Sequence, residues 1–495
     1  MQAGGTRLPY PFARQHGVID LGGDTLARIC LKQGADPMAL IEVRRVIGLP
    51  IEVETAAPAQ FERKLSEVYS ATGLDIGGAE DIGRAGGLTD LIDHMPAIAD
   101  LLDTRDDAPI IRFINGLIAE AARLGASDVH IEPYDAHLVV RMRVDGVLSE
   151  AARLTARLGP LLVSRVKVMA RLDIAERRLP QDGRISLALG GRTLDVRVST
   201  LPSKAGERVV LRLLDRDKAE LTLDDLGMPP AVVTAFRAAL REPNGIVLVT
   251  GPTGSGKTTT LYAGLRLLND GAQSILTVED PVEYAVEGVG QTQVNAKVGM
   301  TFAAGLRAIL RQDPDIVLVG EIRDSETAQI AVQASLTGHL VLSTVHTNDA
   351  IGAVTRLRDM GVEPFLLAST LRVILAQRLV RRLCPACRRA DIADAAIASL
   401  SGIEIGAPVF RATGCASCAG TGYVGRVGLY EIVRIDDALR RLIGSNANES
   451  EMSALAFTNG ATLSHTAREY VRNGVTTVEE AVRVIRQEAN AHADL

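Results

Sequence analysis

Apolar and polar positions follow two different periodic patterns along this chain. Residues 246–249 form a continuous apolar run, and leucines at helical spacing follow over 261–268. A continuous run is typical of a strand buried on both faces of a parallel sheet, and the spacing after it is typical of a covering helix. Further strand patterns occur at 274–279, 316–319 and 339–346. From residue 218 onwards the pattern therefore predicts a doubly wound α/β domain.

Between residues 106 and 217 the rhythm is a strict alternation instead. A periodic helix over 110–124 leads into a strand, and alternating runs then enclose the dipeptides Asp145-Gly146 and Gly190-Gly191. Such dipeptides between alternating runs are typical of β-hairpin turns. The stretch predicts an α+β domain with hairpins.

The N-terminal part divides further. Residues 1–75 carry helix and strand patterns of their own, and we expect a small separate domain there. Residues 76–105, which begin with a Gly- and Asp-rich stretch, are the predicted linker. Residues 218–495 form the predicted α/β domain, and within it residues 380–425 hold four cysteines.

The apolar run at 246–249 leads directly into a P-loop pattern between a strand and a helix, made of Gly251, Pro252, Thr253, Gly254, Ser255, Gly256, Lys257, Thr258 and Thr259. The glycines let backbone N–H groups approach phosphate oxygens closely. The start of the helix adds its dipole, Lys257 reaches the β- and γ-phosphates, and Thr258 offers a hydroxyl to Mg²⁺. The segment predicts a nucleoside triphosphate site.

Candidate catalytic groups follow at the ends of the later strands. Glu279, Asp280 and Glu283 come at the end of the run at 274–279, where open α/β sheets place their ligands, and one of them can accept a proton from the attacking water. Glu321 follows the next strand and is placed to polarise the Mg²⁺ shell or the water. His346 ends the strand after that, where sensing of the γ-phosphate and an ordinary hydrogen-bonded histidine are both open.

Two arginines of the alternating domain carry a second hypothesis. Arg197 shares a strand face with Asp195 and Ser199, and Arg212 lies in a similar strand. Taken alone, each is more typical of a solvated strand arginine. If this domain packs over a neighbour's nucleotide, both can neutralise transition-state charge in trans.

Four of the five cysteines form two C-x-x-C pairs, Cys384 with Cys387 and Cys415 with Cys418. Two such pairs supply four thiolates to a tetrahedral site, which favours structural Zn²⁺ over a redox function. We expect Cys30 to be a small buried residue without a chemical function.

Composition limits the kinds of partner that this protein is suited to bind. The net charge is −6, the pI is about 5.9 and aromatic residues make up only 3% of the chain. An acidic chain with few aromatic rings is poorly suited to nucleic acid. No run approaches the length of a membrane span, and the first residues lack the apolar core of a signal peptide. We therefore expect a cytoplasmic protein.

Several independent motifs resemble one family, the cytoplasmic ATPases of bacterial type II secretion (the GspE family of the secretion ATPase superfamily). Besides the P-loop and the paired C-x-x-C, these motifs are GASDVHIEP (125–133), MRVDGVL (142–148), RLPQDGRIS (178–186), TVEDPVEY (277–284), DPDIVLVGEIRD (313–324) and TGHLVLSTVHTNDA (337–350). The resemblance implies a P-loop (RecA-like) ATPase domain, a PAS-like α+β motor domain before it, a small N-terminal docking domain and a zinc-stapled subdomain.

The resemblance also implies roles for single residues. Glu283 matches the general base of the Asp box, Glu321 matches an atypical Walker B glutamate, and His346 matches the His box. Arg197 and Arg212 match arginines that reach the γ-phosphate, and Arg307, Arg311 and Arg323 are further positive candidates near it. The four cysteines match the family's zinc subdomain, so the implied cofactors are ATP, Mg²⁺ and Zn²⁺.

The family assembles as a homo-hexameric ring with ATP between the second and third domains. The resemblance thus implies a motor that couples ATP hydrolysis to pseudopilus assembly and protein export, held peripherally at the inner membrane by platform proteins that bind residues 1–75. The alternative within the superfamily is a type IV pilus assembly ATPase. A nucleic-acid motor and a zinc-bearing nucleotide-binding scaffold with little turnover are the competing classes. The acidic charge and the few aromatic residues disfavour the first, and the presence of Lys257, Thr258, Glu283 and Glu321 disfavours the second.

Overall fold

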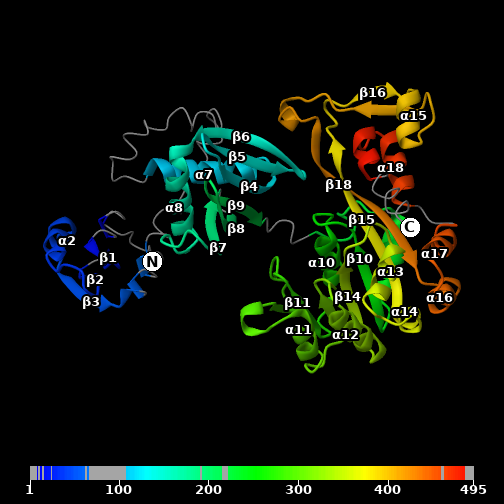
Figure 1. The fold of residues 1–495 in the computed structure, drawn as a ribbon, viewed down its shortest axis with the longest axis horizontal. Helices are drawn as coiled ribbons and strands as arrows, with labels where there is room; N and C mark the ends of the chain where they lie inside the picture. The colour runs from blue at the N-terminus through cyan, green and yellow to red at the C-terminus, as the bar shows by residue number, and fades with distance from the viewer. Residues whose placement is uncertain are drawn as a thin grey trace. The chain divides into compact units, whose positions relative to one another are not determined.

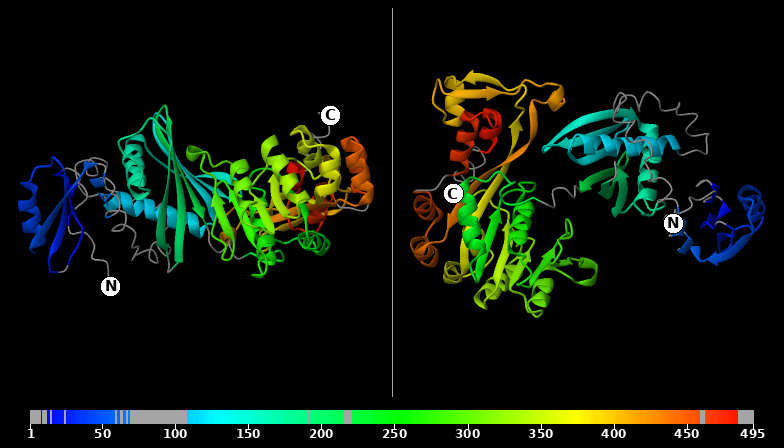
Figure 2. Two further views of the ribbon diagram at one scale, coloured as in Figure 1. Left: turned by 90° about the horizontal axis from the view of Figure 1, so that it is seen from below. Right: turned by 180° about the vertical axis from the view of Figure 1, so that it is seen from behind.

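The structure is a computed structural model. The structure describes residues 8, 12–13, 16–23, 25–58, 60–61, 64–65, 68, 108–189, 192–214, 221–458 and 462–484, so the predicted linker lies outside the described residues. The chain divides into two compact units, Met1–Asp215 and Arg216–Leu495 (Figures 1 and 2). No helix of the described residues is long and apolar enough to cross a bilayer.

The first unit begins with a three-stranded sheet in the order β1-β2-β3. Its elements are β1 (Val18–Asp20), β2 (Ala27–Lys32), α2 (Ala39–Ile47) and β3 (Ile51–Ala56). Helix α2 ends at Gly48, whose positive φ of 69° forms the C-cap. Val43 and Ile47 of the helix pack on Ile29, while Cys30 faces a second cluster with Phe61 and is fully buried, as expected.

The rest of the first unit is a six-stranded antiparallel sheet in the order β6-β5-β4-β9-β8-β7. Its strands are β4 (Ala126–Pro133), β5 (His137–Val144), β6 (Val147–Thr155), β7 (Gln181–Leu189), β8 (Arg192–Ser203) and β9 (Gly206–Leu214). Helices α7 (Ala108–Arg123) and α8 (Gly159–Met169), with a 3₁₀ turn at Ala156–Leu158, contribute to one shared apolar core. The predicted hairpin at Asp145-Gly146 is present, with φ of 49° and 84°.

The second unit is built on a seven-stranded sheet in the order β12-β11-β13-β14-β10-β15-β18. All neighbours are parallel except β15 and β18. The strands are β10 (Gly245–Thr250), β11 (Ile275–Glu279), β12 (Gly290–Gln293), β13 (Ile316–Val319), β14 (Leu340–Val345), β15 (Leu371–Leu383) and β18 (Tyr423–Arg434). This architecture confirms the predicted α/β fold class.

Helices cover the sheet between the strands, as in a doubly wound domain (Figure 1). They are α9 (Pro230–Leu240), α10 (Lys257–Leu268), α11 (Phe302–Ile309), α12 (Ser325–Leu336), α13 (Gly352–Asp359), α14 (Pro364–Thr370), α16 (Asp437–Gly444), α17 (Glu449–Ala456) and α18 (Leu463–Arg472), with a 3₁₀ turn at Ala296–Val298.

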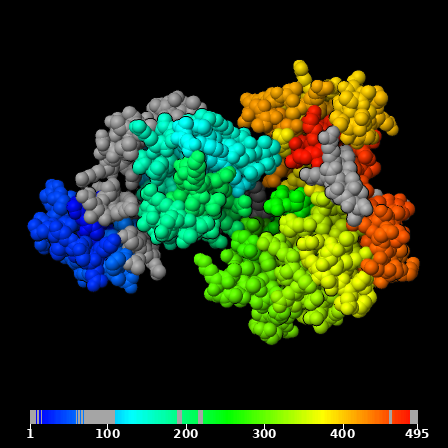
Figure 3. All heavy atoms as spheres, in the orientation of Figure 1, coloured from blue at the N-terminus to red at the C-terminus, as the bar shows by residue number. Residues whose placement is uncertain are grey.

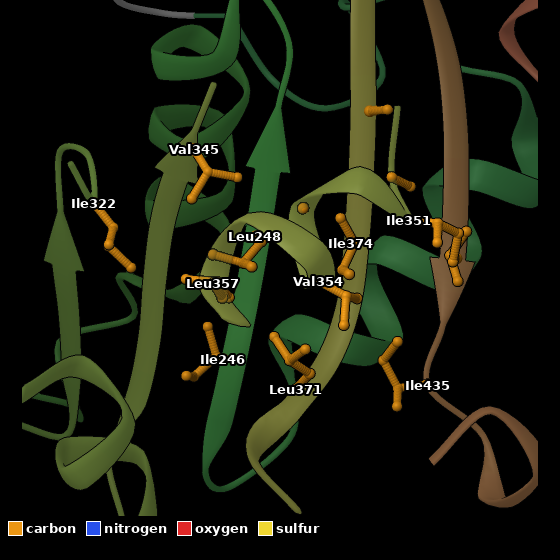
Figure 4. Close-up of a cluster of buried hydrophobic side chains, with 14 of the residues drawn as sticks. Ile246, Leu248, Ile322, Val345, Ile351, Val354, Leu357, Leu371, Ile374 and Ile435 are labelled. Carbon is orange, nitrogen blue, oxygen red and sulfur yellow. The ribbon is translucent and has the colours of Figure 1, made fainter. Parts of the chain in front are cut away.

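Strand β10 is buried on both faces, which explains its continuous apolar run. Ile246 and Leu248 point into the larger core, where Val354 and Ile374 also lie (Figure 4). Val247 and Val249 point into the core on the other face, under α9 and α10. A strand with two buried faces gains apolar burial from every residue, so no alternation is needed.

A small lobe carries the cysteines. It contains β16 (Arg389–Ile392), α15 (Ala395–Ser401), β17 (Pro408–Arg411) and a 3₁₀ turn at Ala416–Cys418, and it lies between β15 and β18 in the chain. Helix α18 packs against β17 and β18. In the space-filling view the lobe is the yellow-to-orange part at the top of the second unit, next to the red α18 (Figure 3).

Candidate nucleotide site and cysteine cluster

The P-loop turn joins β10 to α10, as the sequence pattern predicts. Gly251 and Gly256 adopt positive φ values of 142° and 89°. A β-carbon on Gly251 would lie 2.3 Å from the carbonyl oxygen of Gln377, so only glycine fits there. Helix α10 begins at Lys257, so the backbone N–H groups of its first turn are free of intrahelical partners. Such a turn is a ready anion site.

Lys257 lies within the turn. Its Nζ donates to the carbonyl oxygens of Gly251, at 2.8 Å, and Pro252, at 3.0 Å. Burial lowers the pKa of Lys257 to about 8, and the nearby Glu321 carboxylate opposes that shift. Thr258 is exposed in the same first turn, where its hydroxyl is open to solvent.

Glu321, Arg323 and His346 come together at the ends of two neighbouring strands. Glu321 follows β13 closely and His346 follows β14 directly, and these strands are paired in parallel. The His346 Nε2 atom lies 3.2 Å from a Glu321 carboxylate oxygen, and Arg323 forms an ion pair with the same carboxylate. This ion pair raises the pKa of Arg323. Because Glu321 also acts on Lys257, all four groups belong to one region.

Glu279 lies in a buried polar network behind this region. Its side chain is 2% exposed and accepts hydrogen bonds from the Tyr262 hydroxyl, from Thr277 Oγ1 at 2.5 Å and from Gln291 Nε2 at 3.2 Å. Burial and the Glu279 charge raise the pKa of Tyr262, which therefore stays a donor. Tyr262 and Gln291 were not predicted, because a polar residue in a helix or edge strand has no local signal for a distant partner.

The other two residues of the acidic segment lie on the loop after β11. Asp280 is exposed, and its charge acts on Arg323. Glu283 is half-buried on the same loop. Both are therefore closer to solvent than Glu279, as a group that handles a water molecule must be.

The remaining candidate arginines of the second unit lie around α11. Arg307 forms an ion pair with Glu326 of helix α12, and Arg311 Nη1 donates to the Arg307 carbonyl oxygen at 2.8 Å. Both side chains are exposed, and neither contact involves the P-loop or Glu321.

Arg197 and Arg212 belong to the first unit, where they face each other across β8 and β9. Arg212 Nε donates to Asp128 Oδ1 at 2.9 Å, and Arg143 Nε lies 3.7 Å from the other oxygen. Burial raises the pKa of Asp128, but hydrogen bonds from Arg212 and Ser127 outweigh burial and hold that pKa below its usual value. Asp128 was not singled out from the sequence, and its place on the polar face of β4 was the available signal.

The four predicted cysteines form one cluster. Their sulfur atoms all lie within 4.8 Å of one another, with 3.9 Å between Cys384 and Cys415, 3.9 Å between Cys387 and Cys418, and 3.7 Å between Cys415 and Cys418. Four thiolates around a tetrahedral Zn²⁺ at about 2.3 Å would be about 3.8 Å apart. Burial raises the pKa of Cys418, but hydrogen bonds from the N–H groups of Cys415 and Gly422 outweigh burial and lower that pKa to about 6. The cluster can hold a metal ion.

Comparisons with known proteins agree with this geometry. A family model described as "Type II/IV secretion system protein" matches residues 103–483, and a second model, of a domain of "GSPII protein E", matches residues 7–69. The chain is 54% identical over 487 residues to "Type II secretion system protein E" of Pseudomonas aeruginosa, covering 97% of each chain. It is 52% identical over 487 residues to "Type II secretion system ATPase E" of Vibrio cholerae, again covering 97% of each.

Two solved structures share the fold. The ATPase DotB of Legionella pneumophila gives a TM-score of 0.58 at 21% identity, covering 76% of this chain and 95% of that one. The pilus retraction motor PilT with bound ADP gives a TM-score of 0.51 at 28% identity, covering 74% and 95%.

Proposed function

Because this chain belongs to the family of type II secretion system E proteins, we propose that it hydrolyses ATP at the P-loop and that this hydrolysis drives pseudopilus assembly and protein export. The observation that carries the proposal is the convergence of Lys257, Glu321 and His346 at the ends of three adjacent strands. Nucleotide binding needs only the P-loop, whereas hydrolysis also needs carboxylates and γ-phosphate sensors at this edge.

In the proposed reaction a water oxygen bonds to the γ-phosphorus while the bond to the bridging β–γ oxygen breaks, giving ADP and phosphate. The P-loop N–H groups and Lys257 bind the phosphates. Glu283 accepts the proton of the water, and His346, held by Glu321, contacts the γ-phosphate side. We assign Glu279 a positioning role, because its oxygens are already bonded to Tyr262 and Thr277.

The residues present fit a magnesium ion. The exposed Thr258 hydroxyl and the Glu321 carboxylate are oxygen donors of the kind that Mg²⁺ prefers. Bound Mg²⁺ neutralises phosphate charge and orients the γ-phosphate. Glu321 would face the hydration shell of the bound ion while it keeps His346 in place.

We infer that hydrolysis requires a homo-hexamer in which Arg197 and Arg212 act on ATP of a neighbouring subunit. Two observations support this. Arg197 and Arg212 are adjacent on one polar face of the sheet, and Asp128 forms an ion pair with Arg212 that orients the guanidinium while the Arg212 side chain stays 58% exposed. An exposed but oriented arginine is suited to neutralise transition-state charge. Arg307, Arg311 and Arg323 add positive charge on the second unit.

The N-terminal part is proposed to dock the motor on inner-membrane platform proteins, which would hold a cytoplasmic chain peripherally at the membrane. Residues 7–69 match the model of a GSPII protein E domain, and helix α2 exposes Met38 beside its start and Ile41, at 65% and 62%. Exposed apolar side chains of this kind favour a protein partner. Deleting residues 1–75 should abolish binding to membranes that carry the platform, and unchanged binding would reject this docking role.

The cysteine cluster is proposed to hold structural Zn²⁺. The support is the sulfur spacing near the tetrahedral value and the N–H donors that stabilise a thiolate at Cys418. Zinc would join the C-x-x-C pair that follows β15 to the pair that precedes β18. With four thiolate ligands, no ligand position is left open for catalysis.

A type IV pilus assembly ATPase is the second candidate, because the chain shares its fold with a motor of the pilus system, the retraction motor PilT, at 28% identity. The match of residues 7–69 to a domain of GSPII protein E favours secretion over pilus assembly.

The proposed activity is tested by Lys257→Ala in the full chain, with phosphate release as the assay. We expect hydrolysis to fall to background while the fold is kept. Lys297→Ala, which removes an exposed lysine in a 3₁₀ turn, should behave as wild type. Hydrolysis that survives Lys257→Ala would place the activity elsewhere.

A further inference from the structure

Strand β15 passes next to the P-loop and carries two buried polar residues there. It pairs in parallel with β10, with Thr250 opposite Ala376. Gln377 and Arg378 therefore lie beyond the last paired residue, level with the start of the phosphate loop. They are 2% and 4% exposed, in a strand that is otherwise mostly apolar up to this point. Buried polar side chains at a ligand site are seldom without a function.

Gln377 contacts both ends of the P-loop. A β-carbon on Gly251 would lie 2.3 Å from its carbonyl oxygen, and one on Gly256 would lie 2.8 Å from its side-chain Nε2. Its Oε1 accepts a hydrogen bond of 2.7 Å from Thr260 of helix α10. Gln377 thus holds the beginning and the end of the loop at fixed positions.

Arg378 lies on the opposite face of the strand. Its Nη2 donates to the carbonyl oxygen of Asn348, at 3.1 Å, and to Asn348 Oδ1, at 2.9 Å. The preceding residue, Thr347, has its Oγ1 2.7 Å from Thr250 Oγ1 at the end of β10. The guanidinium is therefore anchored between the P-loop strand and the loop that follows His346.

The charge of Arg378 reaches the P-loop lysine. After burial, the Arg378 charge is a further cause that lowers the pKa of Lys257, against the effect of Glu321. Lys257 and Arg378 are both buried cations, so a polyanion bound at the P-loop would be attracted to both of them. A bound phosphate chain would relieve the repulsion between Lys257 and Arg378, because its negative charge attracts both side chains.

From this placement we propose that Arg378 is a second phosphate-binding cation of the same subunit, acting from behind the P-loop and favouring a nucleoside triphosphate over a diphosphate, with Gln377 as the residue that positions the loop. This inference rests on the proposed nucleotide function and adds to it a residue in cis, distinct from the exposed arginines of either unit.

The test compares the affinities of the full chain for ATP and ADP by titration calorimetry with Mg²⁺ present. A triphosphate carries extra negative charge, and a buried cation whose charge reaches the P-loop should discriminate in its favour by about tenfold. We expect Arg378→Gln to lower the ratio of ATP to ADP affinity about tenfold, and Arg378→Lys, which keeps the charge, to preserve most of it. Gln377→Leu should weaken both nucleotides by a similar factor.

Arg372→Gln is the matched control, since Arg372 lies at the start of the same strand and bonds to Asn244 instead. It should leave the ratio unchanged. Equal loss of ATP and ADP affinity in both Arg378→Gln and Arg378→Lys would overturn the inference and make Arg378 a packing residue. Whether the unaltered chain binds ATP at all is a separate result that judges the proposed function.

Discussion

Replacing Tyr262 by Phe probes how the P-loop helix is tied to the acidic segment. The Tyr262 hydroxyl, on α10, donates to the buried Glu279 carboxylate at the end of β11. Removing a hydrogen bond to a charged group costs about 1.5–3 kcal/mol. Thr277 and Gln291 remain as donors, so we expect a loss near 2 kcal/mol, or a fall in Tm of about 4 °C in a unit of this size.

Thermal unfolding of the full chain, followed by circular dichroism, measures this loss. Tyr284→Phe is the matched control, because the two rings meet edge-on at 4.6 Å and, within the described part of the chain, no hydrogen bond joins the Tyr284 hydroxyl to Glu279. In a double-mutant cycle with Glu279→Gln, the coupling should be about 1–2 kcal/mol. Additive single effects, or an equal fall in Tm for Tyr284→Phe, would refute the network as the link. We also expect lower turnover with nearly unchanged ATP affinity.

Three further predictions concern the lysine, the metal and the ring. Since the pKa of Lys257 is lowered to about 8, the chain without nucleotide loses this positive charge as pH rises through 8. ATP binding requires the charged form, so the affinity for ATP should weaken up to about tenfold per pH unit above 8. An ATP affinity that stays constant between pH 7.5 and 9.5 would contradict the role of Lys257. Cys384→Ser should lower bound zinc measured by mass spectrometry, whereas Cys30→Ala should not; full zinc content in Cys384→Ser would exclude the site. In mixtures of Arg212→Ala and wild-type chains, activity should fall out of proportion to dose if sites are shared, and strict proportionality would exclude action in trans.

Much of the nucleotide site was predictable because its residues follow apolar runs. In an open α/β sheet the carboxyl ends of parallel strands meet at one edge, so Lys257, Glu321 and His346 were expected to lie together from their positions after β10, β13 and β14. The hairpin at Asp145-Gly146 and the cysteine cluster were likewise readable from local spacing.

The contacts that were not predicted all depend on long-range pairing. Gln377 and Arg378 lie in an apolar strand, and nothing local shows that β15 pairs with β10 in the register that brings them to the P-loop. The burial of Glu279 has the same origin, because Tyr262 approaches it from a helix whose packing the sequence does not display. Side-chain partners far apart in sequence become visible only once register and helix packing are known.

The most direct test of the account is phosphate release by Glu283→Gln, measured together with ATP binding in the full chain. A missing general base should slow release by about 10²-fold or more while ATP still binds with an affinity close to that of wild type. Glu287→Gln, an exposed carboxylate on the same loop, should hydrolyse ATP normally. Release at the wild-type rate by Glu283→Gln would contradict the proposed mechanism.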